Sequence, residues 1–264
     1  MEIGLDDPED YEALRRILEI GRLVRELRDK LPSDPVDLAP EGSDLGALMA
    51  TLPEPPVDPR LSIYAGLDSA AGCFLQIVSF IKDGIPTTPV VLPTLARAAL
   101  LAASRVVFVL GPDDASDRER NTRIMLRQES SGLMRLYAAA EQFQSFSALV
   151  PPQDVLDAQR ARAESVNQGV PLLGEAVLLR EMAWVVGKIL AARGYADTAI
   201  AGQVSEHVAW TFNVYSGVAH GFAWPRLVPG TRSLPGHFIA ELLLISNVTH
   251  LAFDLAIRRS TVRG

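Results

Sequence analysis

The segment from Arg60 to Lys82 reads RLSIYAGLDSAAGCFLQIVSFIK and decides the fold class. Its apolar residues recur every three or four positions, which is the spacing of one face of an α-helix. The residues that share this spacing are Ile63, Leu67, Ala71, Phe74, Ile77, Val78 and Ile81. Because the apolar stripe is broad, we expect a helix with one side buried in a larger core.

Most of the chain after this segment carries the same spacing. Further helices are predicted over residues 89–110, 113–146, 153–167, 174–193, 197–220 and 236–259, with short turns containing Gly or Pro between them. The stretch Arg105–Leu110 is rich in β-branched residues and could form a strand, but no second stretch of similar strength offers it a partner. We therefore predict an all-α bundle of about seven to nine helices, without a sheet of three or more strands.

Two different segments precede this bundle, which occupies residues 60–264. Residues 1–31 contain an amphipathic helix whose seam consists of Ala13, Ile17, Ile20, Val24, Leu27 and Leu31. Residues 32–59 hold seven of the 18 prolines, so an extended linker is expected there, with one or two helical turns at Leu45–Leu52. The seam could pack on its own chain or serve as a dimerisation arm. A homodimer through this helix and the bundle is the expected assembly.

Composition limits the classes of function. The chain has 264 residues, of which 48% are hydrophobic, and its formal net charge is −7. Extensive disorder is therefore excluded, and a chain-wide basic surface for duplex nucleic acid is disfavoured. The single cysteine, Cys73, cannot form an intrachain disulfide. We expect no secretory or transit signal, because the first residues, MEIGLDDPED, are acidic. Arg97 and Arg105 interrupt the most apolar stretch. We expect a cytoplasmic, bacterial protein without membrane contact, metal or cofactor.

The string DDASD contains Asp113, Asp114 and Asp117 and matches the DDxxD pattern of all-α prenyl-transfer and terpene-cyclising enzymes. In such enzymes the carboxylates hold Mg²⁺ ions that bind a diphosphate leaving group. The string also follows a Gly-Pro pair, where aspartates commonly cap the start of a helix. A second metal-binding motif has no clear match downstream. We therefore favour the cap and keep an Mg²⁺-dependent diphosphate enzyme as an alternative.

Three arginines follow this string at helical spacing, namely Arg120, Arg123 and Arg127. They could form one basic stripe that binds phosphates. They could equally be a solvated face, since Glu119 lies four residues before Arg123 and can pair with it. Both interpretations stay open from the sequence.

The most specific strings are FNVYSGVAHG at residues 212–221, followed by Trp224-Pro225, and LPTLARAALLAASRVVFVLGPDD at residues 92–114. Together they resemble a bacterial helical group related to the HEPN superfamily (higher-eukaryote and prokaryote nucleotide-binding). The resemblance covers residues 60–258 in helix order. It implies an all-α domain that often dimerises and works in nucleic-acid-linked defence or toxin systems.

In active HEPN members an Arg and a His cleave RNA without a metal. The His takes the proton from the ribose 2′-hydroxyl and the Arg stabilises the charged phosphate. His220 matches this histidine, but Asn213 stands at the arginine position, and a neutral amide cannot supply the charge. The resemblance therefore favours a non-catalytic or weakly catalytic module, with a metal-independent ribonuclease using His220 as an alternative. His220 before Gly221 also suits a helix C-terminal cap. Further candidates for contact with RNA or a nucleotide are Tyr215, Ser216, Asn247 and His250.

Overall fold

The computed structural model describes residues 8–85, 87–88, 90–142, 150–194, 201–227 and 234–262. Within those ranges it contains nine α-helices and no strand, which confirms the all-α prediction. The elements are α1 (Pro8–Arg28), the 3₁₀ turn η1 (Pro35–Leu38), α2 (Asp44–Thr51), α3 (Pro59–Lys82), α4 (Val91–Leu110), α5 (Ala115–Ala140), α6 (Gln153–Asn167), α7 (Glu175–Ala192), α8 (Ala201–Ala219), the 3₁₀ turn η4 (Trp224–Leu227) and α9 (Leu234–Ser260). The stretch that could have been a strand, Arg105–Leu110, forms the last turns of α4.

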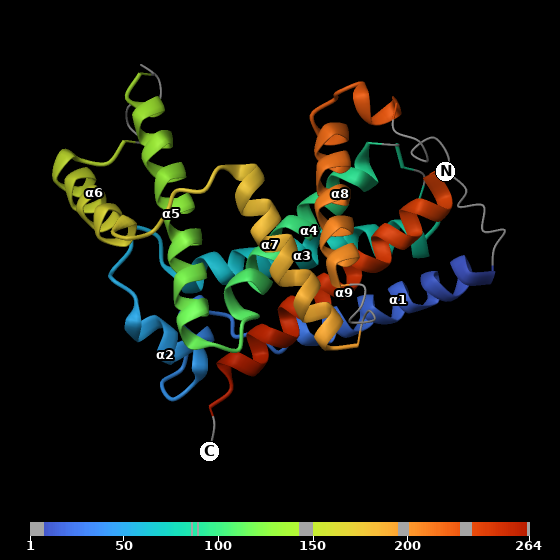
Figure 1. Cartoon of the computed structure of the whole chain (residues 1–264), viewed down its shortest axis with the longest axis horizontal. Helices are drawn as coiled ribbons and strands as arrows, with labels where there is room; N and C mark the ends of the chain where they lie inside the picture. The colour runs from blue at the N-terminus through green and yellow to red at the C-terminus, as the bar shows by residue number, and fades with distance from the viewer. Residues whose placement is uncertain are drawn as a thin grey trace.

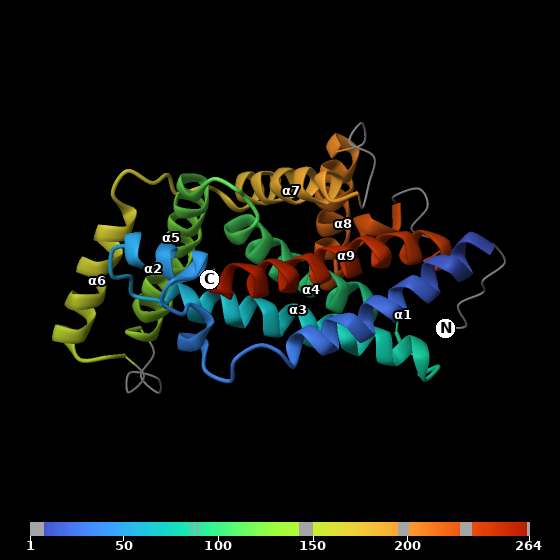
Figure 2. The same cartoon turned by 90° about the horizontal axis from the view of Figure 1, so that it is seen from below.

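The bundle is built around α4, which packs against α3, α5, α7, α8 and α9. Figure 2 shows α7 and α8 on one side, α4 and α9 in the middle, and α1 and α3 on the other side. Most of the buried side chains of α4 are apolar, and Phe108 and Leu110 are among those fully buried. The Ala- and Leu-rich composition of this helix thus reflects its central place, where apolar surface meets other helices on several sides.

The N-terminal helix packs on its own chain. Ile17, Ile20 and Val24 are buried, and α1 contacts α3 and α9 along the bundle. The seam predicted from the spacing is therefore the packing surface of this helix, which removes the apolar stripe from water. The homodimer expected through it stays a prediction.

The proline-rich segment is less extended than expected. It contains η1, capped by Asp34, and α2, whose cap residue Ser43 accepts a hydrogen bond from the Gly46 N–H at 2.9 Å. Leu45 and Leu48 of α2 are buried. Prolines at the first positions of a helix lose no hydrogen bond, so a proline-rich sequence is compatible with such short helices. The predicted helical turns at Leu45–Leu52 correspond to α2.

Helices α5 and α6 extend to one side of the bundle, next to α2 (Figure 1). Helix α6 packs on α5, and Arg162 of α6 forms an ion pair of 2.7 Å with Glu54 in the proline-rich segment. The chain returns from this arm through residues 168–174. There the Arg123 guanidinium donates to the Gln168 carbonyl and the Gln128 amide donates to the Leu173 carbonyl, both from α5.

The expectation of a cytoplasmic protein is wrong. Three helical stretches are long and apolar enough to cross a membrane, namely α3, α4 and Phe238–Ser260 of α9. A run without any charge is not necessary for this, because membrane-spanning helices tolerate one or two charges that pair or reach towards the surface. In the bundle, 39% of the α3 window is buried against other helices, compared with 61% for α4 and 67% for α9. Helix α3 is thus the most outward of the three.

Candidate functional site

The turn between α4 and α5 is held by three side chains from other positions in the chain. The last carbonyl groups of a helix lack partners within it, and here Asn121 donates to the Phe108 carbonyl at 2.8 Å. The Arg118 guanidinium donates to the carbonyls of Pro112 and Asp113 at 2.9 and 2.6 Å. Burial, together with the charge of Arg259, lowers the pKa of Arg118. The turn is consequently a fixed part of the fold.

Arg259 of α9 completes this arrangement. Its guanidinium donates to the carbonyls of Leu110 and Pro112 at 3.3 and 3.1 Å, and it forms an ion pair of 2.8 Å with Asp44. A second, longer ion pair of 3.3 Å reaches Asp113. Because the Arg259 side chain is only 12% exposed, its charge is partly desolvated and the pairs count for more than surface pairs do. Asp44 belongs to α2, so one residue joins three elements.

The acidic string serves first as a helix cap. Asp114 accepts hydrogen bonds from the Ser116 hydroxyl and from the backbone N–H groups of Ser116 and Asp117. These bonds, the Ser116 hydroxyl foremost, lower the pKa of Asp114. Within the described part of the chain, no group of three or more His, Cys, Asp or Glu could hold a metal ion. Asp114, one of the three carboxylates of the alternative Mg²⁺ site, thus caps α5, as the favoured interpretation predicts.

Asp113 and Asp117 instead line a cleft between the α4–α5 turn and α7, which we name the Trp184 cleft. Its volume is about 700 Å³. Figure 1 shows α7 lying between α5 and α8. The cleft is lined on one side by Phe108, Gly111, Pro112, Asp113, Asp117, Arg120 and Asn121, and on the other by Glu181, Trp184, Val185, Lys188, Ile189, Ala192 and Arg193.

Gly111 allows the floor of this cleft to form. A Cβ atom at this position would lie 2.1 Å from Cδ1 of Ile189 and 2.5 Å from the Val107 carbonyl oxygen. A side chain at this position would collide with both atoms, so glycine suits the close approach between the end of α4 and the last turn of α7.

The lining of the cleft contains as many acidic as basic side chains. Arg193 forms an ion pair with Asp254 of α9, and Asp113 is paired with Arg259. Lys188 lies with its Nζ atom 5.3 Å from the centre of the Trp184 ring, one helical turn away, in a cation–π contact. The Trp184 side chain is 50% exposed. The cleft therefore offers an aromatic face beside a cation, together with acidic acceptors.

The three arginines of the predicted stripe have three different surroundings. Arg120 is exposed and lines the Trp184 cleft. The Arg123 guanidinium donates a hydrogen bond of 2.7 Å to the Gln168 carbonyl, as described above. Arg127 is half-buried on α5. Only Arg120 lines the cleft, while Arg123 bonds to the chain between α6 and α7, so binding of a phosphate by all three arginines stays a prediction.

The candidate residues of α8 also separate. Asn213 is exposed, and its amide donates to the Ala209 carbonyl of the same helix at 2.8 Å. Tyr215 is buried and its hydroxyl donates to the carboxylate of Glu241 on α9. Burial, then the charge and hydrogen bond of Glu241, raise the pKa of Tyr215 well above its ordinary value. Tyr215 thus joins α8 to α9, and Asn213 faces away from that contact into solvent.

His220 lies at the C-terminal end of α8 in a capping geometry. Gly221 has a φ angle of +71°, the Phe222 N–H donates to the Gly217 carbonyl, and the Gly221 N–H donates to the Val218 carbonyl. These two bonds define a Schellman motif, with His220 as the cap residue. The His220 backbone N–H donates to the Ser216 carbonyl, and its exposed ring lies 5.9 Å from the Phe222 ring. The sequence-based interpretation of His220 as a cap agrees with this geometry.

The rest of the FNVYSGVAHG string explains the return of the chain after α8. A Cβ atom on Gly217 would lie 2.5 Å from the Trp224 ring and 2.7 Å from the Pro225 ring. Gly217 therefore makes room for the Trp-Pro pair to fold back onto α8, and Gly221 makes the turn between them. Much of the most specific string in the chain consequently encodes a helix end and the segment that packs on it.

The last candidates lie on α9. Asn247 is buried at 9% exposure, and its Oδ1 atom has no hydrogen-bond partner among the residues that the structure describes. His250 is half-buried, one turn before Asp254. Neither residue lines the Trp184 cleft, and of the predicted binding residues only Arg120 does so. The structure thus does not bring the candidates of α5, α8 and α9 to one site.

Comparison of the chain with protein-family models, with curated proteins and with solved structures found no match. The resemblance to the HEPN group accordingly stays a prediction. Sequence reasoning missed Trp184, Lys188 and Arg193, which form the far wall of the cleft. An exposed Trp four residues before a Lys on an amphipathic helix was the available signal.

Proposed function

We propose that the protein is a non-catalytic, HEPN-like helical module that binds a nucleotide, free or within single-stranded RNA, in the Trp184 cleft. The observation that carries this proposal is the half-exposed Trp184 ring with Lys188 beside it, on the wall of a cleft of about 700 Å³. A base can stack on such a ring whatever its sequence. The volume lies within the range typical of small-molecule sites.

The other groups of the cleft suit the remaining parts of a nucleotide. Arg120 and Lys188 can bind the phosphate as charged donors. The carboxylates of Asp117 and Glu181 can accept hydrogen bonds from ribose hydroxyls or from amino groups of the base. A ligand that carries both donors and a phosphate matches this mixture of charges better than inorganic phosphate does. Ligand stacking on Trp184 would also keep Lys188 close to the phosphate.

Two observations support a non-catalytic role. His220 caps α8, and the group standing at the arginine position, Asn213, bonds to its own helix. The ribonuclease mechanism needs a cation next to the base that takes the proton, and Asn213 does not supply one. The involvement of the module in a nucleic-acid-linked defence or toxin system is a further part of this proposal, implied by the resemblance.

The test compares Trp184→Ala with Trp210→Ala, because the two tryptophans are 50% and 52% exposed and only the first lines the cleft. Binding of nucleoside monophosphates and of a short labelled single-stranded RNA is measured by ligand-detected NMR and fluorescence anisotropy in EDTA. Loss of one stacked base corresponds to about 1–3 kcal/mol, so Trp184→Ala should weaken binding about 5- to 150-fold. Trp210→Ala should bind as the wild type does.

Equal binding by both variants, or no binding by the wild type, would refute the nucleotide site. The labelled RNA is also checked for cleavage after long incubation. Intact RNA is the expected result. Cleavage that His220→Ala abolishes would instead establish the ribonuclease.

A second candidate function, membrane association, is favoured by the apolar helices. Helices α3 and α4 follow each other in the chain, pack together, and have 24 and 20 residues. About 20 apolar residues cross a bilayer core. Flotation with vesicles of phosphatidylcholine and phosphatidylglycerol, followed by carbonate extraction, tests this candidate. Protein that stays with the vesicles after extraction supports insertion, and protein that never floats excludes it.

A further inference from the structure

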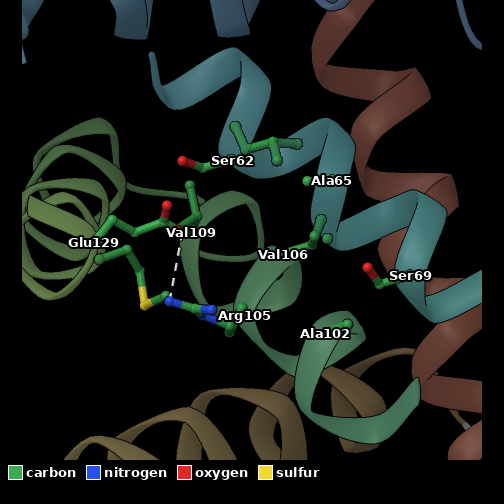
Figure 3. A pocket seen from close by; sticks show the side chains of 11 residues that line it. Ser62, Ala65, Ser69, Ala102, Arg105, Val106, Val109 and Glu129 are labelled. Carbon is green, nitrogen blue, oxygen red and sulfur yellow. Dashed lines mark ion pairs between the residues drawn. The ribbon is translucent and has the colours of Figure 1, made fainter. Parts of the chain in front are cut away.

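A second, smaller cavity lies between α3, α4 and α5, away from the Trp184 cleft (Figure 3). We name it the Arg105 pocket. Its volume is about 170 Å³, equivalent to roughly five or six water molecules at about 30 Å³ each. It is lined by Ser62, Ile63, Ala65, Gly66 and Ser69 of α3, Ala102, Arg105, Val106 and Val109 of α4, and Met125 and Glu129 of α5.

Small residues on α3 and α4 create this space. Gly66 faces Val106 so closely that a Cβ atom there would lie 2.9 Å from a methyl group of Val106. The two helices therefore approach each other at Gly66, and the alanines on either side leave a hollow that larger side chains would fill. Most of the wall is apolar, which favours a ligand with an apolar body.

Arg105 and Glu129 form a charged pair in the otherwise mostly apolar lining of the pocket. Nη2 of Arg105 lies 3.4 Å from Oε1 of Glu129, and the two side chains are 37% and 26% exposed. Charge-assisted hydrogen bonds between such groups are normally about 2.7–2.9 Å long, so the pair is loosely joined. Within the described residues, the Arg105 guanidinium makes no other ion pair or hydrogen bond. Both groups keep capacity for a ligand, one as donor and the other as acceptor.

We propose that the Arg105 pocket binds a small uncharged molecule with an apolar body and one amide or lactam edge. The amide oxygen accepts from Arg105 and the amide N–H donates to Glu129, so that both charges gain a hydrogen bond. An anion is repelled by Glu129 and a cation by Arg105, whereas a hydrocarbon gives neither group a new hydrogen bond. The hydroxyls of Ser62 and Ser69 stand at the edge of the same space (Figure 3).

The experiment uses three probes of similar shape, namely benzamide, benzoate and ethylbenzene. Their affinities for the full chain are measured by ligand-detected NMR titration. The wild type should bind benzamide most tightly. Arg105→Gln should weaken benzamide binding about 10- to 100-fold, as expected when a hydrogen bond to a charged group is lost. Arg135→Gln, an exposed arginine of α5 outside the pocket, is the matched control and should leave benzamide binding unchanged.

The variant Glu129→Gln gives the sharper result. It removes the negative charge that repels an anion, so benzoate should become the preferred ligand through Arg105. A purely apolar cavity cannot show this reversal. Ala102→Leu should fill the pocket and abolish binding of benzamide, with circular dichroism confirming that the variant is folded.

Three outcomes would overturn the proposal. These are equal affinity of the wild type for ethylbenzene and benzamide, no gain in benzoate affinity with Glu129→Gln, or no benzamide binding at all. None of these three outcomes affects the test of nucleotide binding in the Trp184 cleft.

Discussion

His207 lies half-buried on α8, and burial lowers the pKa of its imidazole. The unfolded chain takes up the proton near the ordinary histidine pKa of about 6.5, whereas the folded chain keeps the ring neutral to lower pH. Stability contributed by the neutral ring is therefore fully present above that value and is lost as the pH falls through the pKa of the folded state. The half-buried imidazole of His207 thus makes the stability of the bundle sensitive to mild acid.

The variant His207→Gln should reduce this sensitivity. We expect its free energy of unfolding to fall less than that of the wild type between pH 7.5 and pH 5, because it has no imidazole to protonate. Urea unfolding followed by circular dichroism measures both proteins. The difference at pH 8, where the imidazole is neutral in both states, gives the effect of the substitution itself. Parallel pH profiles for the two proteins would show that His207 contributes nothing.

At the scale of elements, the ends of the helices define the fold as much as their apolar faces do. Asp114 begins α5 and Gly221 ends α8, and both roles follow from residue types that satisfy the free backbone groups of a helix end. These ends could be predicted from the sequence, as could most helix positions, because their signals lie within a few residues. The α6 boundaries, 153–167, agree with the prediction from spacing. Local signals also explain why Asp114 was assigned correctly as a cap.

The Schellman motif at Gly221 provides a test at this scale. Gly221→Ala places a Cβ atom on a residue with a φ angle of +71°, which should lower the free energy of unfolding by about 1–2 kcal/mol. Gly72→Ala is the control, since Gly72 is exposed within α3 and a Cβ atom there meets nothing within 4 Å. That variant should raise stability by about 0.5–1 kcal/mol. Chemical unfolding of both distinguishes backbone strain from a general effect of added methyl groups.

Contacts between residues far apart in the chain could not be predicted from the sequence. Trp184 and Asp117 line the same cleft because α7 packs against α4, and no sequence signal near either residue predicts that packing. Arg105 was taken as an interruption of an apolar run, yet the fold places it beside Glu129 of α5. The wrong cellular location has the same origin, because Arg97 and Arg105 were taken to end the apolar stretch, whereas α4 is long and apolar enough to cross a membrane with both charges in it. Tertiary pairing decides what such a charge does.

At the scale of the whole molecule, Arg259 joins α9, α2 and the α4–α5 turn. Removal of one partner from a partly desolvated set of ion pairs leaves the others unsatisfied. Arg259→Met should therefore lower the free energy of unfolding by about 3 kcal/mol. Arg258→Met, whose side chain is 66% exposed, should cost less than about 1 kcal/mol. Urea denaturation of the two variants makes the comparison, and similar losses for both would contradict a joining role of Arg259.

One turn of α4 forms a wall of both cavities. Phe108 lines the Trp184 cleft, while its neighbours Val106 and Val109 line the Arg105 pocket. A tightly packed helix transmits small displacements, so we expect a ligand in one cavity to alter the shape of the other. By thermodynamic reciprocity, whatever factor benzamide applies to the affinity for a nucleotide, the nucleotide applies to the affinity for benzamide. The affinity of each cavity for its ligand would then depend on whether the other cavity is occupied.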